Sequence, residues 1–168
     1  AALGSSGTDL TEKTKIISRG QLLGELNPED ALKAARTLNA VYGQNNAQLQ
    51  DSFNLMNAIE NATSLTMQDI VTMLPKAGAT LNAAGVTFKE ALPLFVAMKA
   101  GGIEAAEGAN AIKSMTISAL DSSKAAKASF KELTGRDLGE LAKSAKNGAE
   151  MFRMIAGEVA KLETPAQR

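Results

Sequence analysis

Beyond residue 8, the apolar residues of the chain recur with the period of an α-helix. Apolar residues recur at spacings of three and four, which places them on one face of an α-helix. No segment has the alternating period and β-branched content of a strand. The sequence therefore predicts an all-α fold: a compact multi-helix domain of short antiparallel hairpins. Helices are expected near residues 28–42, 46–60, 67–84, 88–100, 104–120, 124–134 and 138–162.

Side chains that can cap a first turn mark several helix starts. Asn27 precedes Pro28, and proline suits the first helical position. Thr66 and Thr87 each have an acid three residues later, which is the pattern of a capping box. These signals predict where helices begin. Glycines that end helices are expected at Gly43, Gly85 and Gly101.

Two of the predicted helices contain a proline, Pro75 and Pro93. Proline removes one backbone hydrogen bond and bends a helix. We expect Pro75 to split its helix into 67–74 and 76–84. The helix over 88–100 is strongly apolar, so we expect it to be the most buried.

The last part of the chain predicts two further apolar stripes. In the helix over 104–120 small side chains dominate the stripe, which allows close helix packing and suggests self-association. The segment 138–162 predicts one long amphipathic helix with an exposed polar face. The first stripe comprises Gly108, Ile112, Met115 and Ala119, with Ala105 and Ala109 beside it. The second comprises Leu141, Ala145, Phe152, Ile155, Val159 and Leu162.

Composition sets the domain organisation. Of 168 residues, 45% are apolar and 4% aromatic, so a core of Ala, Leu, Ile, Val and Met is expected. Residues 1–8 (AALGSSGT) indicate a flexible tail or linker, and 9–164 indicate one helical domain of a longer protein. The longest apolar run, Ala91–Met98, is far shorter than the roughly 20 residues of a membrane-spanning helix.

The chain lacks the side chains of most catalytic and metal sites. It has no histidine and no cysteine, which removes imidazole bases, thiol nucleophiles and zinc sites of the usual kind. We expect no catalytic residue, cofactor or metal, and no enzymatic activity. Two carboxylate pairs could still serve a glycosidase, Glu104 with Glu107 and Asp137 with Glu140. Acids in a helical first turn, favoured by the helix dipole, are the simpler interpretation.

Other candidate features have an equally simple structural interpretation. Lys124, Lys127 and Lys131 share one helix face and could contact phosphate, but 18 basic residues balance 18 acidic ones. We therefore expect a solvated face and no specific nucleic acid. The segment Asn61–Thr63 matches a glycosylation acceptor. Four methionines at helical spacing are expected to fill the core rather than form a binding surface: Met67, Met73, Met98 and Met115.

The order of the helix caps, glycines and apolar positions along the chain resembles the core region of phage tail tape measure proteins. In that family a capped helix contains a proline and small residues, as in Leu74–Gly78, and the next begins like Gly85–Glu90. A turn like Gly101–Ile103 then opens a small-residue helix, and Phe130–Gly135 resembles a later lysine-rich helix. The resemblance covers roughly residues 25–162. Gly101 stands where the family usually has alanine, and Pro93 is outside the family pattern.

The resemblance implies a structural role without an active site. A tape measure protein lies in the lumen of the tail tube, helps to set tail length and leaves ahead of the DNA. The implied partners are the tail tube protein and tail assembly chaperones, and the implied locations are the virion and, during assembly, the host cytoplasm. Two alternatives remain open: a helical protein–protein interaction module unrelated to length, and a cell-wall lytic domain.

Overall fold

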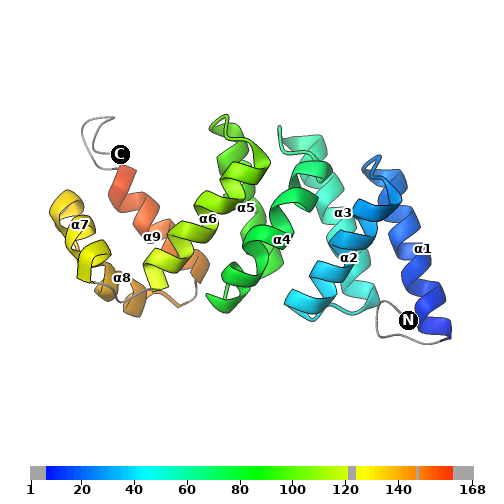
Figure 1. Ribbon diagram of the computed structural model, residues 1–168, viewed down its shortest axis with the longest axis horizontal. Coiled ribbons are helices and arrows are strands. Elements are labelled where there is room, and N and C mark those ends of the chain that lie inside the picture. Colours follow the sequence, from blue (N-terminus) through cyan, green and yellow to red (C-terminus); the bar gives the residue numbers. More distant parts are fainter. Residues whose placement is uncertain (1–6, 121–123, 147, 161–168) are drawn as a thin grey trace.

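The computed structural model describes residues 7–120, 124–146 and 148–160, which contain nine α-helices and no strand (Figure 1). The expected all-α fold class is confirmed. Residues 161–168 lie outside the described ranges, and so does the expected helix end near Leu162. The helices are α1 (Thr8–Leu23), α2 (Pro28–Tyr42), α3 (Asn46–Ala62), α4 (Met67–Ala83), α5 (Phe88–Ala100), α6 (Ala105–Leu120), α7 (Lys124–Thr134), α8 (Leu138–Ser144) and α9 (Gly148–Ala160).

Helices α1–α6 follow one another along the long axis of the molecule, with α1 at one end and α7 at the other (Figure 1). Successive helices reverse direction. Helix α4 packs against both α2 and α6, and α1 packs against α3. The helices therefore stack as in helical repeat proteins, where each unit buries its apolar face against its neighbours.

Local capping explains the helix boundaries. The side chain of Asn27 accepts a hydrogen bond from the Asp30 backbone, with Pro28 in the first turn. Complete capping boxes begin α4 at Thr66 and α5 at Thr87, as the sequence predicts. A third begins α3, where Asn45 is the capping residue. Each box satisfies backbone N–H groups that the helix itself leaves without a partner.

Among the described residues, α4 is the most buried helix, so the prediction that 88–100 would hold this place is wrong. Eight residues of α4 are buried against four of α5. The cause is position, because α4 lies between α2 and α6 and also contacts α3 and α5. The buried residues of α4 are Met67, Ile70, Val71, Met73, Leu74, Ala77, Gly78 and Leu81.

Pro75 does not split α4, which is continuous from Met67 to Ala83, so the predicted break is wrong. The proline is exposed, whereas Leu74 and Ala77 beside it are fully buried. Packing on both sides of the proline holds the helix together although one backbone hydrogen bond is missing.

The apolar stripe of α6 differs from the predicted one. Met115 is 44% exposed, and Thr116 is fully buried instead. The Thr116 hydroxyl donates to the Ile112 carbonyl at 2.7 Å, which satisfies its polar group inside the core. Of the other predicted positions, Gly108, Ile112, Ala105 and Ala109 are buried, and the Ala119 side chain is outside the described part.

The predicted long helix over 138–162 is also wrong, because the chain forms two helices, α8 and α9. Ala145 ends α8 in an extended conformation. The break redirects the chain so that Gly148, the first residue of α9, is buried and Phe152 joins the core of α1–α6. Tertiary packing of α9 accounts for a break that the apolar period does not show.

Candidate functional site

The carboxylates proposed as a glycosidase pair on α6 are both exposed. Glu104 precedes the helix and Glu107 lies in its first turn. A negative charge at this end of a helix is stabilised by the helix dipole. Their placement thus matches the structural interpretation of these acids.

The second pair lies where α7 meets α8. Asp137 caps α8, because its Oδ1 accepts from the backbone N–H groups of Gly139 at 2.8 Å and Glu140 at 3.1 Å. Asp137 and Glu140 line a shallow cavity of about 270 Å³. The hydrogen bond from the Glu140 N–H is the largest influence and lowers the pKa of Asp137, while burial acts in the opposite direction. The hydrogen bond from Gly139 and the charges of Lys131 and Lys127 lower this pKa further. The general acid of a glycosidase needs a raised pKa, so Asp137 does not have the environment of that acid, and its two backbone hydrogen bonds identify it as a helix cap.

Two lysines of the basic row on α7 lie near the same carboxylate. Lys127 and Lys131 both act on Asp137 through their charges, and the Lys124 side chain is outside the described part. Lys127 is only partly exposed. The two lysines therefore have an internal counter-charge, which weakens their case as a phosphate-binding surface.

The remaining candidates also have structural surroundings. Met67 and Met73 are buried and Met98 packs against the core, as expected for core filling. Met115 is exposed, so the prediction is wrong for this methionine. In the Asn61–Thr63 segment, the Thr63 hydroxyl already donates to the Ile59 carbonyl at 2.9 Å.

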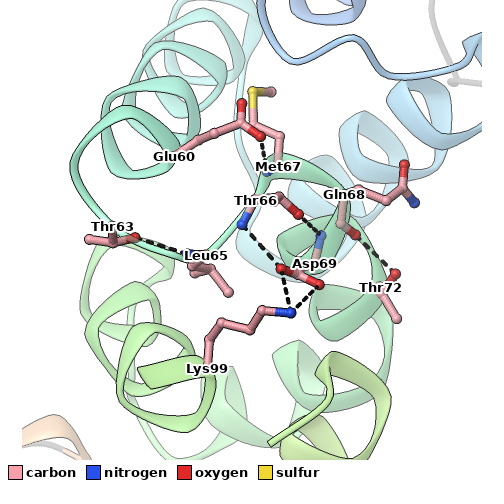
Figure 2. Close-up of polar contacts among 9 residues, drawn as sticks. All are labelled: Glu60, Thr63, Leu65, Thr66, Met67, Gln68, Asp69, Thr72 and Lys99. Carbon is pink, nitrogen blue, oxygen red and sulfur yellow. Dashed lines mark hydrogen bonds and ion pairs between the residues drawn. The ribbon is translucent and has the colours of Figure 1, made fainter. Parts of the chain in front are cut away.

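The junction of α3 and α4 holds several polar contacts (Figure 2). The backbone N–H of Met67 donates to Oε1 of Glu60 at 2.9 Å, so the last turn of α3 helps to cap α4. The N–H of Leu65 donates to Oγ1 of Thr63 at 3.1 Å. Leu65 and Met67 are both buried, so these bonds satisfy backbone N–H groups that water cannot reach.

Within this junction, Thr66 and Asp69 cap each other and Lys99 joins them. The Asp69 N–H donates to Oγ1 of Thr66 at 3.0 Å, and the Thr66 N–H donates to Oδ2 of Asp69 at 3.1 Å. Nζ of Lys99, near the end of α5, lies 3.2 Å from Oδ2 of Asp69 (Figure 2). One carboxylate thus connects the start of α4 to the end of α5.

The environment of Asp69 lowers its pKa. Burial by itself acts to raise the pKa, since the side chain is only 15% exposed. The hydrogen bonds from Thr66 and the hydrogen bond and charge of Lys99 outweigh burial. The carboxylate is therefore held in its ionised form and stabilises the junction.

Side-chain bonds also connect α2 to α4 at both ends. Nε2 of Gln68 donates to Oδ2 of Asp30 at 3.0 Å, and the same oxygen accepts from Nδ2 of Asn27 at 2.7 Å. At the other end, Nδ2 of Asn82 donates to the Val41 carbonyl at 2.8 Å. Sequence analysis missed these links and the one to Lys99, because the partners are 30 to 41 residues apart and no local pattern marks them.

An open groove lies between the start of α3 and the start of α5. Its volume is about 470 Å³. The rings of Tyr42 and Phe88 meet there edge to face with centroids 6.0 Å apart, and burial raises the pKa of Tyr42 to about 12. Leu55 adds an apolar wall, while Asp51 and Lys89 supply one charge of each sign. This mixed lining resembles a protein contact surface more than a small-molecule site.

Neither a metal-binding cluster nor a membrane-spanning helix occurs among the described residues. Within them, no group of three or more Asp and Glu side chains could hold a metal ion. No helix in the same ranges is long and apolar enough to cross a membrane. The polar side chains that this part of the chain brings together mostly cap helices and connect them.

Comparison with known proteins gives one family match. The model of the family described as phage-related minor tail protein matches residues 1–168. No curated protein and no solved structure matches the chain.

Proposed function

Because the chain belongs to the phage-related minor tail protein family, we propose that it is a region of a tape measure protein. In this role it lies within the tail tube, contributes to tail length and leaves ahead of the DNA. The tail tube protein and tail assembly chaperones are its proposed partners.

The observation that supports this proposal is that the polar side chains cap helices and connect them to one another. Asp69 caps α4 and binds Lys99 on α5, and Asp30 binds Gln68 between α2 and α4. Asp137 caps α8. Polar side chains that cap and connect helices are typical of a structural scaffold. The role of a scaffold depends on its dimensions rather than on a reactive centre.

The length contributed by this region depends on whether it stays folded in the tail. As one continuous helix, 168 residues span about 250 Å at 1.5 Å per residue. The folded chain, whose helices stack side by side, is several-fold shorter, since a compact domain of this size has a radius of gyration of about 15 Å. The two states therefore differ several-fold in length, which a tail-length measurement resolves.

The test is an in-frame deletion of the region in the parent protein, paired with a tandem duplication as a control of opposite sign. Tail lengths are measured by electron microscopy. If the tape measure holds the region as one extended helix, deletion shortens the tail by about 250 Å and duplication lengthens it by the same amount. A region that stays folded changes the tail length by several-fold less. Tails of unchanged length in both variants contradict the proposal.

We further propose that the region opens easily when the tail requires it. Among the described residues its core includes seven alanines, and small side chains contribute less to stability than large ones. We therefore expect thermal unfolding of the isolated chain well below 90 °C. A midpoint above about 90 °C would place it among hyperstable proteins and count against easy opening.

The groove beside Tyr42 favours a second candidate function, a module that binds another tail protein without influencing length. Replacing Leu55 with lysine places a charge in the apolar wall of this groove. An interaction module would then yield fewer tails of normal length, whereas a tape measure region would yield tails in normal number. Lys33 on α2 is exposed, so Lys33→Glu serves as a charge-changing control outside the groove.

We also propose that this region has no lytic activity. Zymography on peptidoglycan provides the test. Clearing that disappears in Glu104→Gln or Glu140→Gln would refute this proposal and restore the lytic alternative.

A further inference from the structure

We propose that α7–α9 form a terminal unit that detaches from α1–α6 before the rest of the fold opens. The inference goes beyond the proposed function and does not depend on it. It concerns the order in which parts of this fold separate, which follows from how each part is held.

The apolar contacts of α7–α9 are divided between two small groups. Leu138, Leu141 and Met151 are buried, but they are not part of the continuous core of α1–α6. Among the described residues of α7–α9, Phe152 is the one that joins that core. Among the described side chains of α9, one aromatic ring thus provides the apolar attachment to the larger core.

Two further attachments hold this unit: α8 packs against α6, and the start of α9 makes a close approach of backbones. Gly148, the first residue of α9, is buried against the loop that joins α4 to α5. A Cβ atom at this position would lie 2.6 Å from Cγ2 of Val86 and would collide with the Ala84 carbonyl oxygen. This clash cannot be relieved by a change of side-chain rotamer, because the Ala84 carbonyl belongs to the backbone. The site therefore accepts glycine alone as long as α9 stays docked.

Helices α1–α6 are held together in a different way. Helix α4 buries eight residues against its neighbours, and the bonds from Gln68 to Asp30 and from Lys99 to Asp69 connect α2, α4 and α5. Opening this part requires the simultaneous loss of many contacts. Parts of a protein that are held by fewer buried contacts open at lower free energy than its core.

The test uses hydrogen–deuterium exchange with mass spectrometry on the 168-residue chain, comparing two alanine substitutions in the same helix. Gly148→Ala introduces the collision. Gly157→Ala is the matched control, because Gly157 is exposed and a Cβ there meets nothing within 4 Å. We expect Gly148→Ala to speed exchange in α8 and α9 by about 5- to 150-fold, the range that overpacking of a tight site produces. Exchange in α2–α6 should stay within about 2-fold of the original chain. Gly157→Ala should slow exchange in α9 or leave it unchanged, since alanine favours a helix interior.

Two results would overturn the proposal. One is a uniform rise of exchange across all helices in Gly148→Ala, including the case in which this variant fails to fold, because α7–α9 would then open only with the whole. The other is exchange in α8 and α9 that stays unchanged. The unmodified chain gives an independent check in low concentrations of urea, where α7–α9 should lose protection before α2–α6. Simultaneous loss of protection in both parts would also refute the inference.

Discussion

Replacing Asp69 with asparagine tests whether one carboxylate holds the α3–α4 junction to α5. Asparagine has nearly the same shape and can still accept the Thr66 N–H bond, but it lacks the charge. The substitution therefore removes the charge-assisted part of the capping bond and the ion pair with Lys99, whose atoms lie 3.2 Å apart. Because the two side chains have nearly the same volume, the substitution leaves the packing of the core unchanged.

The structure sets the size of the expected effect. Hydrogen bonds to a charged group contribute about 1 kcal/mol more than neutral ones. The ion pair adds about 0.2–1 kcal/mol, the range for pairs that water partly reaches, since the Asp69 and Lys99 side chains are 15% and 25% exposed. We expect Asp69→Asn to lower the free energy of unfolding by about 1–2 kcal/mol at neutral pH.

The pH dependence follows from the sign of the pKa shift. The fold lowers the pKa of Asp69, so its contribution is fully present above the unfolded-state value of about 3.9. The contribution is lost as the pH falls through the lower pKa of the folded state. The difference between the variant and the original chain should therefore be largest near neutral pH and shrink towards about pH 2.

Urea unfolding followed by circular dichroism measures this difference at each pH. Asp51→Asn is the matched control, because Asp51 is exposed on α3, and it should change stability by less than about 0.5 kcal/mol. A double-mutant cycle with Lys99→Met isolates the ion pair, with an expected coupling of about 0.2–1 kcal/mol. Equal stability of Asp69→Asn and the original chain at neutral pH would refute the reasoning. A deficit that persists unchanged in acid would refute it as well.

Three further predictions concern the core, the proline and the tyrosine. Phe53→Ala should cost about 3–5 kcal/mol in urea unfolding because Phe53 is fully buried, whereas Leu22→Ala, at a site 84% exposed, should cost less than about 0.5 kcal/mol. A smaller loss at Phe53 than at Leu22 would contradict the core assignment. Pro75→Ala should raise the free energy of unfolding by about 1–3 kcal/mol, because it restores a backbone N–H within a continuous helix, and a lower thermal midpoint would contradict this. Tyr42 is the single tyrosine, so its ultraviolet titration should show a pKa of about 12. Because burial raises this pKa, the stabilisation that it reflects is complete below about pH 10 and is lost as the pH rises through about 12. Titration near 10 in the folded chain would show that the ring is exposed.

Much of the local structure could be predicted because its causes lie within a few residues. The boxes at Thr66 and Thr87 and the cap at Asn27 join atoms three residues apart, and they begin helices where expected. Gly43 and Gly85 have positive φ angles of 64° and 77°, which glycine adopts without strain. The sequence showed these features directly because no distant contact decides them.

The errors arose where distant contacts decide the outcome. Pro75 was expected to break α4, but packing on both sides keeps that helix continuous. The apolar period of the last segment continues through residue 145, yet the seat of Gly148 against the Ala84 carbonyl requires a break. Met115 and Thr116 are neighbours, and only the direction from which α4 meets α6 determines which of them is buried.

The features of the fold and of the candidate site fall into two groups: those that the sequence determined and those that depend on tertiary structure. The sequence by itself determined that the chain is all-α, where most helices begin, and that side chains for histidine- or cysteine-dependent chemistry are missing. The tertiary structure alone decided that α4 is central, that Lys99 meets Asp69, and that a groove opens beside Tyr42. The physical reason is range: capping energies act within one helical turn, whereas burial and ion pairing depend on how residues far apart in the chain are brought together.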